Sequence, residues 1–187
     1  SAEIISSYCE LTDRVIESII YTCAEVSLTR NSKNKTEKFS VLSVGGYGRQ
    51  QMAPHSDVDI LFLVPTNITK QITNIIETTL YILWDLKLKV GHATRNISEC
   101  VELAKEDFTI RTSLLESRLI HGNTVLAEKL ENELWAKVFK QSKSEFVEAK
   151  LLERTKRLKK HGGQRYVLEP NIKEGKGGLR DLQSLFW

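Results

Sequence analysis

The sequence predicts an α+β fold in which a small sheet is covered by helices, with one helix before this core and a helical extension after it. Short apolar runs at 39–44 and 58–64 flank a glycine-rich turn, which is typical of two strands. An amphipathic segment follows Pro65 and leads to a third extended run at 86–97. From residue 124 onward, leucines recur at helical spacing. We therefore expect a packing helix at 1–30, a core at 31–122 and an extension at 123–187.

The N-terminal segment carries an apolar stripe at helical spacing, formed by Ile4, Tyr8, Leu11, Val15 and Ile19, with Ile5, Ile16 and Ile20 beside them. This stripe predicts a helix that packs on the core. Residues 31–38 are polar and have no period, so they predict a loop. Further along, Ser98 is the predicted N-cap of a short helix, and Gly162-Gly163 is expected to break the helix of the extension.

The stretch 41–64 is the most informative part of the chain and reads VLSVGGYGRQQMAPHSDVDILFLV. Side chains alternate in a strand, so Asp57 and Asp59 point the same way, with Cα atoms roughly 7 Å apart. Such a pair suits a hard divalent cation and repels itself when bare. Gly45-Gly46 lets backbone N–H groups approach a phosphate, although a pair of glycines by itself favours a tight turn that needs positive φ.

Other phosphate-binding motifs do not fit. Gly46-Tyr47-Gly48 lacks the third glycine of a dinucleotide fingerprint, and Gly175-Lys176 lacks both the upstream glycine and the Ser/Thr of a Walker A loop. What favours phosphate chemistry at Gly45-Gly46 is the pair of aspartates that follows at the head of the next strand.

Composition excludes several classes of protein. With 187 residues, 41% of them hydrophobic, the chain can bury a core, and it holds no apolar run near the roughly 18 residues of a membrane span. No signal-peptide pattern opens it. The three cysteines are widely spaced, which argues against disulfides or a zinc site and fits burial in a cytoplasmic protein. The net charge of +3 is too small to indicate nucleic acid, but residues 141–187 carry +5, which leaves −2 for the rest.

Three separated motifs together resemble one family. They are GGYGR with MAPHSDVDILFL, then LWDLKLKVGHATRNISEC at 83–100, then LEPNIKEGKGGLRDLQSLFW at 168–187. They are similar to the amino-terminal catalytic domain of the bacterial protein-PII uridylyltransferase/uridylyl-removing enzymes, within the nucleotidyltransferase superfamily that includes DNA polymerase β. The resemblance covers about 39–187 and implies a nucleotidyltransferase core with a small mixed sheet.

The resemblance also implies a reaction and a site. UMP would pass from UTP to a tyrosine hydroxyl of the PII regulatory protein, with release of pyrophosphate; in the full-length enzyme, glutamine would be an effector. Mg²⁺ (or Mn²⁺) would be held by Asp57, Asp59 and Glu116. The nucleotide would contact Gly45, Gly46, Arg49, Ser56, Lys173 and Arg180, with the segment around Lys173 closing on the site. No nucleic acid or membrane partner is expected.

Several interpretations stay open. Glu116 and Arg118 fit a surface ion pair on a helix as well as a metal site, and Asp85 and Asp107 are weaker third carboxylates that fit helix ends better. His92 could touch substrate or be structural. The cationic residues at 154–160 predict a solvated helix face first and a contact to phosphate or an acidic partner second, and the segment around Lys173 could be a flexible basic loop.

Two departures from the family pattern matter. The family has glycine and glutamate where this chain has Gln50 and Gln51, and we expect a helix to tolerate glutamine there. None of the four histidines precedes an aspartate, so uridylyl removal is not expected of this stretch, which resembles a domain fragment. Two other functions remain: a nucleotidyltransferase with another donor or acceptor, and a catalytically silent nucleotide-binding module.

Overall fold

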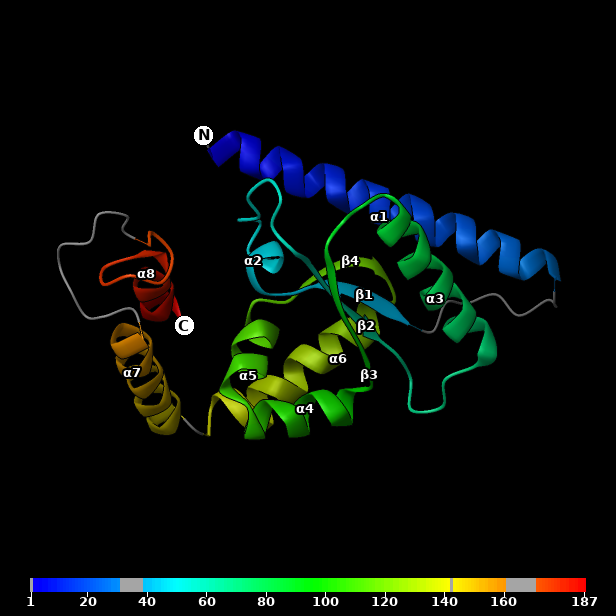
Figure 1. The fold of residues 1–187 in the computed structure, drawn as a ribbon. Coiled ribbons are helices and arrows are strands. Elements are labelled where there is room, and N and C mark those ends of the chain that lie inside the picture. Colours follow the sequence, from blue (N-terminus) through cyan, green and yellow to red (C-terminus); the bar gives the residue numbers. More distant parts are fainter. Residues whose placement is uncertain (1, 31–38, 142, 161–170) are drawn as a thin grey trace.

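A four-stranded mixed sheet forms the centre of the protein (Figure 1). The computed structural model describes residues 2–30, 39–141, 143–160 and 171–187. The strands run in the order β3-β2-β1-β4. β1 pairs antiparallel with both β2 and β4, whereas β2 and β3 are parallel. Their bounds are Ser40–Ser43 for β1, Val58–Leu63 for β2, Val90–Arg95 for β3 and Arg118–Gly122 for β4.

Helices cover both faces of this sheet. Figure 1 shows α1 (Ala2–Arg30) and α3 (Lys70–Asp85) on one side, and α4 (Ile97–Glu106), α5 (Phe108–Leu115) and α6 (Thr124–Leu134) on the other. The alternation of side chains along β2 explains the two layers: Ile60 and Phe62 join the α1/α3 core, whereas Leu61 and Leu63 join the core under α4–α6. The predicted α+β class, with a small mixed sheet, a preceding helix and a helical extension, is confirmed. The boundaries at residues 30 and 122 stay a prediction.

The buried face of α1 differs from the predicted stripe. Ile4 and Leu11 are 64% and 60% exposed, so their assignment to the packing face was wrong. The buried face consists of Cys9, Thr12, Ile16, Ile20, Cys23 and Ala24, so burial of Ile16 and Ile20, two of the predicted residues, is confirmed. Thr12 is tolerated there because its hydroxyl donates to the Tyr8 carbonyl, 2.8 Å away. All three cysteines are buried and free, as predicted.

Helix caps correct a second expectation. Asn96, and not Ser98, caps α4: the Asn96 side chain accepts from Glu99 N (3.0 Å), and the Glu99 carboxylate accepts in return from Asn96 N (2.8 Å). This reciprocal capping box satisfies two N–H groups at once, which a serine inside the first turn cannot do. Asp107 caps α5 by accepting from Thr109 N and Ile110 N, in agreement with its assignment to a helix end.

The extension is helical but divided. α6 runs into a π-helical turn, η1 (Trp135–Phe139), then α7 (Lys143–Lys160) and finally α8 (Leu179–Phe186), which Figure 1 places beside α7. The α7 cations are not merely solvated: Arg157 and Arg154 pair with Asp181 at 2.5 and 3.2 Å. Two arginines of the basic cluster therefore hold α8, whereas the three lysines of the cluster are exposed, as predicted for a solvated face. The loop predicted at 31–38 and the break at Gly162-Gly163 lie outside the described residues. Within the described ranges, no helix combines the length and apolarity that a bilayer crossing requires.

Candidate active site around Asp57 and Asp59

The two aspartates lie at the start of β2. Asp57 precedes the strand and is exposed, whereas Asp59 is half-buried within it. Asp59 shares its strand face with Leu61, so its carboxylate lies on the side covered by α4–α6. Burial raises the pKa of Asp59 above its ordinary value, the charge of Asp57 raises it further, and the Lys173 ammonium opposes the rise. The structure thus brings Lys173, distant in sequence, to the aspartates.

Two glycines leave room for the Asp59 carboxylate. A Cβ atom at Gly45 would lie 3.7 Å from Oδ2 of Asp59, and one at Gly91 only 2.3 Å from Oδ1. Gly91 is the direct partner of Asp59 in the parallel β2–β3 register. Sequence reasoning missed Gly91, because its effect depends on strand pairing, which the chain pattern does not reveal.

The glycine-rich turn is a short helix, α2 (Gly45–Gly48). Gly45 has φ +59°, so the turn does require a residue that tolerates the left-handed region. Gly48 is needed for close packing, since a Cβ atom there would lie 1.9 Å from the Glu116 carbonyl oxygen. Phosphate binding at Gly45 and Gly46 stays a prediction alongside this structural role.

Gln50 follows α2 in the left-handed conformation, with φ +57°. We expected glutamine to suit a helix here, and that reasoning was wrong because the backbone has already left the helix. Glycine would adopt this conformation with less strain. Ser56 lies in the exposed loop before β2, where its N–H donates to the Ala53 carbonyl at 3.0 Å.

Glu116 is not grouped with the two aspartates. Its side chain is 7% exposed, and its two oxygens accept hydrogen bonds from Arg49 Nη1 and from the indole Nε1 of Trp187. In the part of the chain that the structure describes, no three His, Cys, Asp or Glu side chains are close enough to share a metal ion. Metal binding by Glu116 therefore stays a prediction alongside its contacts with Arg49 and Trp187.

Arg118 does not pair with Glu116, so the alternative of a helix-surface ion pair between them is wrong. Arg118 opens β4 and donates to Asp13 of α1 at 2.8 and 3.0 Å, and the Tyr47 hydroxyl donates to the same carboxylate at 2.6 Å. Burial and this hydrogen bond raise the pKa of Tyr47 well above its ordinary range. Asp13 thus joins α1, α2 and β4 beneath the candidate site.

The basic glycine-rich segment around Lys173 contains two predicted nucleotide-binding cations, Lys173 and Arg180, and they have different interaction partners. Lys173 acts electrostatically on Asp59. The guanidinium of Arg180 is 3.7 Å from Glu174 and lies over the Trp187 ring, with 5.8 Å between Cζ and the ring centroid. Gly177 N–H donates to Asp181. Arg180 is therefore engaged within the segment.

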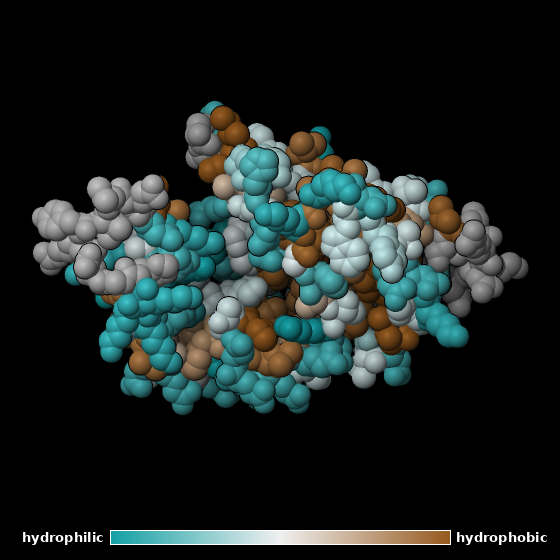
Figure 2. Space-filling view, in the orientation of Figure 1, coloured by the Kyte–Doolittle hydropathy of each residue, from teal (hydrophilic) through white to brown (hydrophobic). Residues whose placement is uncertain are grey.

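A cavity of about 280 Å³ opens beside Asp59. Among the residues that line it are the apolar Leu61, Ala93 and Leu114 and the polar His92 and Arg95. Figure 2, in the orientation of Figure 1, shows a hollow near the centre of the visible face of the molecule, with hydrophobic residues inside and hydrophilic ones around it. The cavity is close to the lower end of the volumes that bind small molecules. His92 is exposed and contacts Trp84 edge-on, with 5.8 Å between ring centroids.

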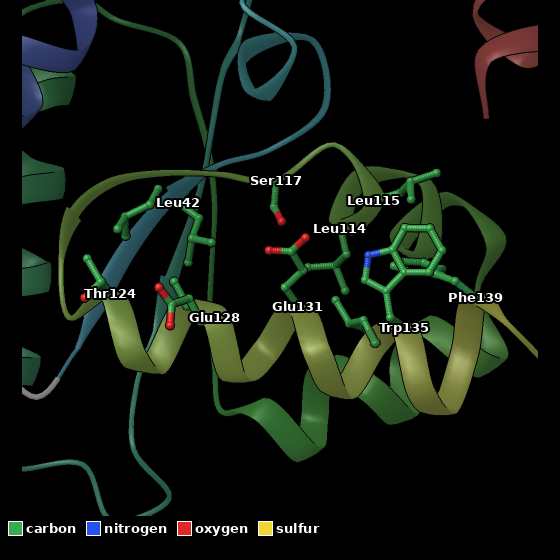
Figure 3. A pocket seen from close by; sticks show the side chains of 12 residues that line it. Leu42, Leu114, Leu115, Ser117, Thr124, Glu128, Glu131, Trp135 and Phe139 are labelled. Carbon is green, nitrogen blue, oxygen red and sulfur yellow. The ribbon is translucent and has the colours of Figure 1, made fainter.

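A second cavity of about 300 Å³ lies between α6, η1 and the α5–β4 connection. Figure 3 shows Ser117 and Leu115, which flank Glu116 in sequence, facing Glu131 and Trp135 across it. Asp57 and Asp59 are not among the residues that line this cavity. The cavity beside Asp59 is therefore the one that belongs to the candidate site.

Comparison with known proteins shows which enzymes the chain is similar to. A sequence model described as GlnD PII-uridylyltransferase matches residues 145–187. A bifunctional uridylyltransferase/uridylyl-removing enzyme of Cereibacter sphaeroides is 50% identical over 98% of the chain. The chain is a homologue of the bifunctional uridylyltransferase/uridylyl-removing enzymes. Enzymes of the same description from Ruegeria pomeroyi and Caulobacter vibrioides are 49% and 51% identical over 97% and 95% of the chain.

The chain spans only about a fifth of the length of these relatives. It covers 20%, 20% and 19% of the three proteins. Among solved structures, one described as "Crystal structure of the toxin-antitoxin with AMP-PNP" is 12% identical, with a TM-score of 0.35, and the likeness covers 64% of this chain and 86% of that one.

Proposed function

We propose that this chain carries the site for metal-dependent transfer of UMP from UTP to a tyrosine hydroxyl of the PII regulatory protein, with release of pyrophosphate. The observation that carries the proposal is the pair Asp57 and Asp59, of which Asp59 lines a cavity, in a chain about 50% identical to uridylyltransferase/uridylyl-removing enzymes. In the full-length protein, glutamine would act as an effector. The transfer of UMP would take place in the cytoplasm, with no nucleic acid or membrane as partner.

The donor set fits Mg²⁺ or Mn²⁺. Asp57 and Asp59 supply hard carboxylate oxygens, and Mg²⁺ in nucleotide sites is commonly held by one or two carboxylates together with substrate phosphates and waters. Glu116 is therefore not required as a third ligand. When bound, the metal would neutralise charge on the phosphates and lower the pKa of the acceptor hydroxyl.

The chain's own residues would orient the reactants. Gly45 and Gly46 permit close approach of the triphosphate to the backbone at α2. Arg49, half-exposed beside them, offers positive charge to the departing pyrophosphate, and Lys173 adds charge beside Asp59. The acceptor oxygen attacks the α-phosphorus in line, the bond to the bridging oxygen breaks, and pyrophosphate leaves with the bonding electrons.

Calorimetric titration of UTP into the chain in the presence of Mg²⁺ tests the proposal. We expect binding that Asp57→Asn and Asp59→Asn each abolish while the circular dichroism spectrum stays unchanged. Glu77→Gln is the matched control, because it makes the same carboxylate-to-amide change on the exposed face of α3. Unchanged UTP binding in both aspartate variants would refute the site.

A transfer assay separates the alternatives. Labelled UTP, CTP, ATP and GTP are each offered with PII protein and Mg²⁺, and we expect label on PII from UTP alone. Transfer from another nucleotide would indicate a different donor. UTP binding without transfer to any acceptor would instead favour a silent nucleotide-binding module.

A further inference from the structure

A three-residue chain of hydrogen bonds joins the C-terminal helix to the candidate site. The indole Nε1 of Trp187 donates to one oxygen of Glu116, and Nη1 of Arg49 donates to the other. Glu116 lies in the two-residue connection between α5 and β4, and its carbonyl oxygen packs against Gly48 of α2. The carboxylate is thus held by two groups that are far apart in the sequence.

The electrostatics explain why both donors matter. A carboxylate that is 7% exposed is costly unless its charge is paired and its oxygens accept hydrogen bonds. Arg49 provides the countercharge for Glu116, and Trp187 satisfies the oxygen that Arg49 does not bind. Without the indole N–H, that oxygen would compete for the guanidinium or turn toward water, and Arg49 would lose its fixed orientation.

The Trp187 ring is itself held by cations of the extension. Lys150 Nζ lies 4.7 Å from the ring centroid, and Arg180 Cζ lies 5.8 Å from it. α8 is in turn attached to α7 through Asp181 and Arg157. The position of the indole therefore reports the position of the whole C-terminal segment.

We propose that Trp187 is a positioning residue that acts through Glu116 to hold the Arg49 guanidinium in place for the phosphates beyond the α-phosphate. This inference rests on the proposed function. It assigns Glu116 a role different from metal binding, and it makes docking of α8 a condition for full nucleotide affinity. Trp187→Phe keeps a ring between the two cations and removes only the N–H, so it isolates the hydrogen bond.

The first test reads the hydrogen bond directly and requires no nucleotide. The chain has three tryptophans, so its ¹H–¹⁵N spectrum has three indole resonances, and Trp187→Phe identifies one of them. We expect Glu116→Gln to shift the Trp187 indole resonance and to leave the Trp84 and Trp135 resonances in place. An unmoved Trp187 resonance would overturn the inference, whatever the chain binds.

The second test is a double-mutant cycle on nucleotide affinity with Mg²⁺ present. Trp187→Phe and Glu116→Gln are each expected to weaken UTP binding about tenfold, or about 1.4 kcal/mol, and the double variant to weaken it no further. UMP, which lacks the outer phosphates, should bind all variants equally. Trp135→Phe is the matched control, since this indole borders the other cavity.

The outcomes separate the two proposals. Additive losses in the double variant, or equal losses for UTP and UMP, would overturn the role of Trp187 while leaving the proposed function intact. No UTP binding by the unaltered chain would overturn the proposed function and the role of Trp187 with it, even where the indole resonance responds to Glu116→Gln.

Discussion

Replacing Gly91 by alanine should disable the site while leaving the fold in place. The new Cβ would lie 2.3 Å from Oδ1 of Asp59, whereas Cβ atoms essentially never come within 3.0 Å of another heavy atom, so about 0.7 Å of overlap must be relieved. The overlapping atom is the end of a half-buried side chain, and rotating it costs of order 0.5–1.5 kcal/mol. Moving the paired backbones of β2 and β3 would cost more, because overpacking typically costs about 1–3 kcal/mol.

We therefore expect the Asp59 carboxylate to turn away and the strands to stay paired. A displacement of about 1 Å at a reacting centre can lower activity roughly 100-fold, equivalent to about 2.8 kcal/mol. The predicted result is a loss of UTP affinity or transfer rate near this size, with less than about 1.5 kcal/mol lost in the free energy of unfolding.

Urea denaturation measures the loss of stability in Gly91→Ala, and a parallel Mg²⁺-dependent UTP titration measures the loss of affinity. Thr94→Ala is the control, since Thr94 is exposed on the same strand and its side chain points to the face opposite Asp59. Wild-type UTP affinity in Gly91→Ala would refute the reasoning, and so would a loss of stability large enough to unfold the chain.

Three further predictions concern stability. Gln50→Gly should raise the free energy of unfolding by about 0.5–1 kcal/mol, because it removes the backbone strain of a glutamine in the left-handed conformation. Gln51→Gly should lower the free energy of unfolding. Equal losses of stability for the two variants in denaturant titrations would contradict this. Gly48→Ala should cost about 3 kcal/mol or more in the same titrations, because its Cβ would meet rigid backbone 1.9 Å away, and a loss below about 1 kcal/mol would mean that α2 moves freely. The third prediction concerns stability in acid. Partial burial alone would raise the pKa of Asp181, but the Gly177 N–H and the α7 guanidinium groups lower it by more. The pKa of Asp181 therefore lies below the ordinary value of about 3.9. This ion pair's stabilisation is present above that value and lost as the pH falls through the lower folded pKa. In denaturant titrations the free energy of unfolding should therefore fall in acid below about pH 4, and Asp181→Asn should reduce that fall.

Much of the fold follows from local pattern. A short apolar run after a glycine-rich turn indicates β2, and the spacing of isoleucines indicates α3, because both depend only on near neighbours in the chain. The packing face of α1 could not be predicted as well, because Ile4 and Leu11 are as apolar as the residues that are buried. Which side of a long helix meets the core depends on what it packs against. The cap at Asn96 was missed for a similar reason, since neighbouring Asn and Ser side chains offer equivalent oxygens.

Sequence alone determined the chemistry that this chain offers: two aspartates one residue apart at the head of a strand, behind a glycine turn, in a stretch whose motifs resemble one enzyme family. Those features are local, and the alternation of a strand predicts that both carboxylates lie on one face. Only the tertiary structure decided their surroundings. Gly91 faces Asp59 through strand pairing, and Glu116 turns to Arg49 and Trp187 because a buried carboxylate takes the nearest donors that the fold supplies.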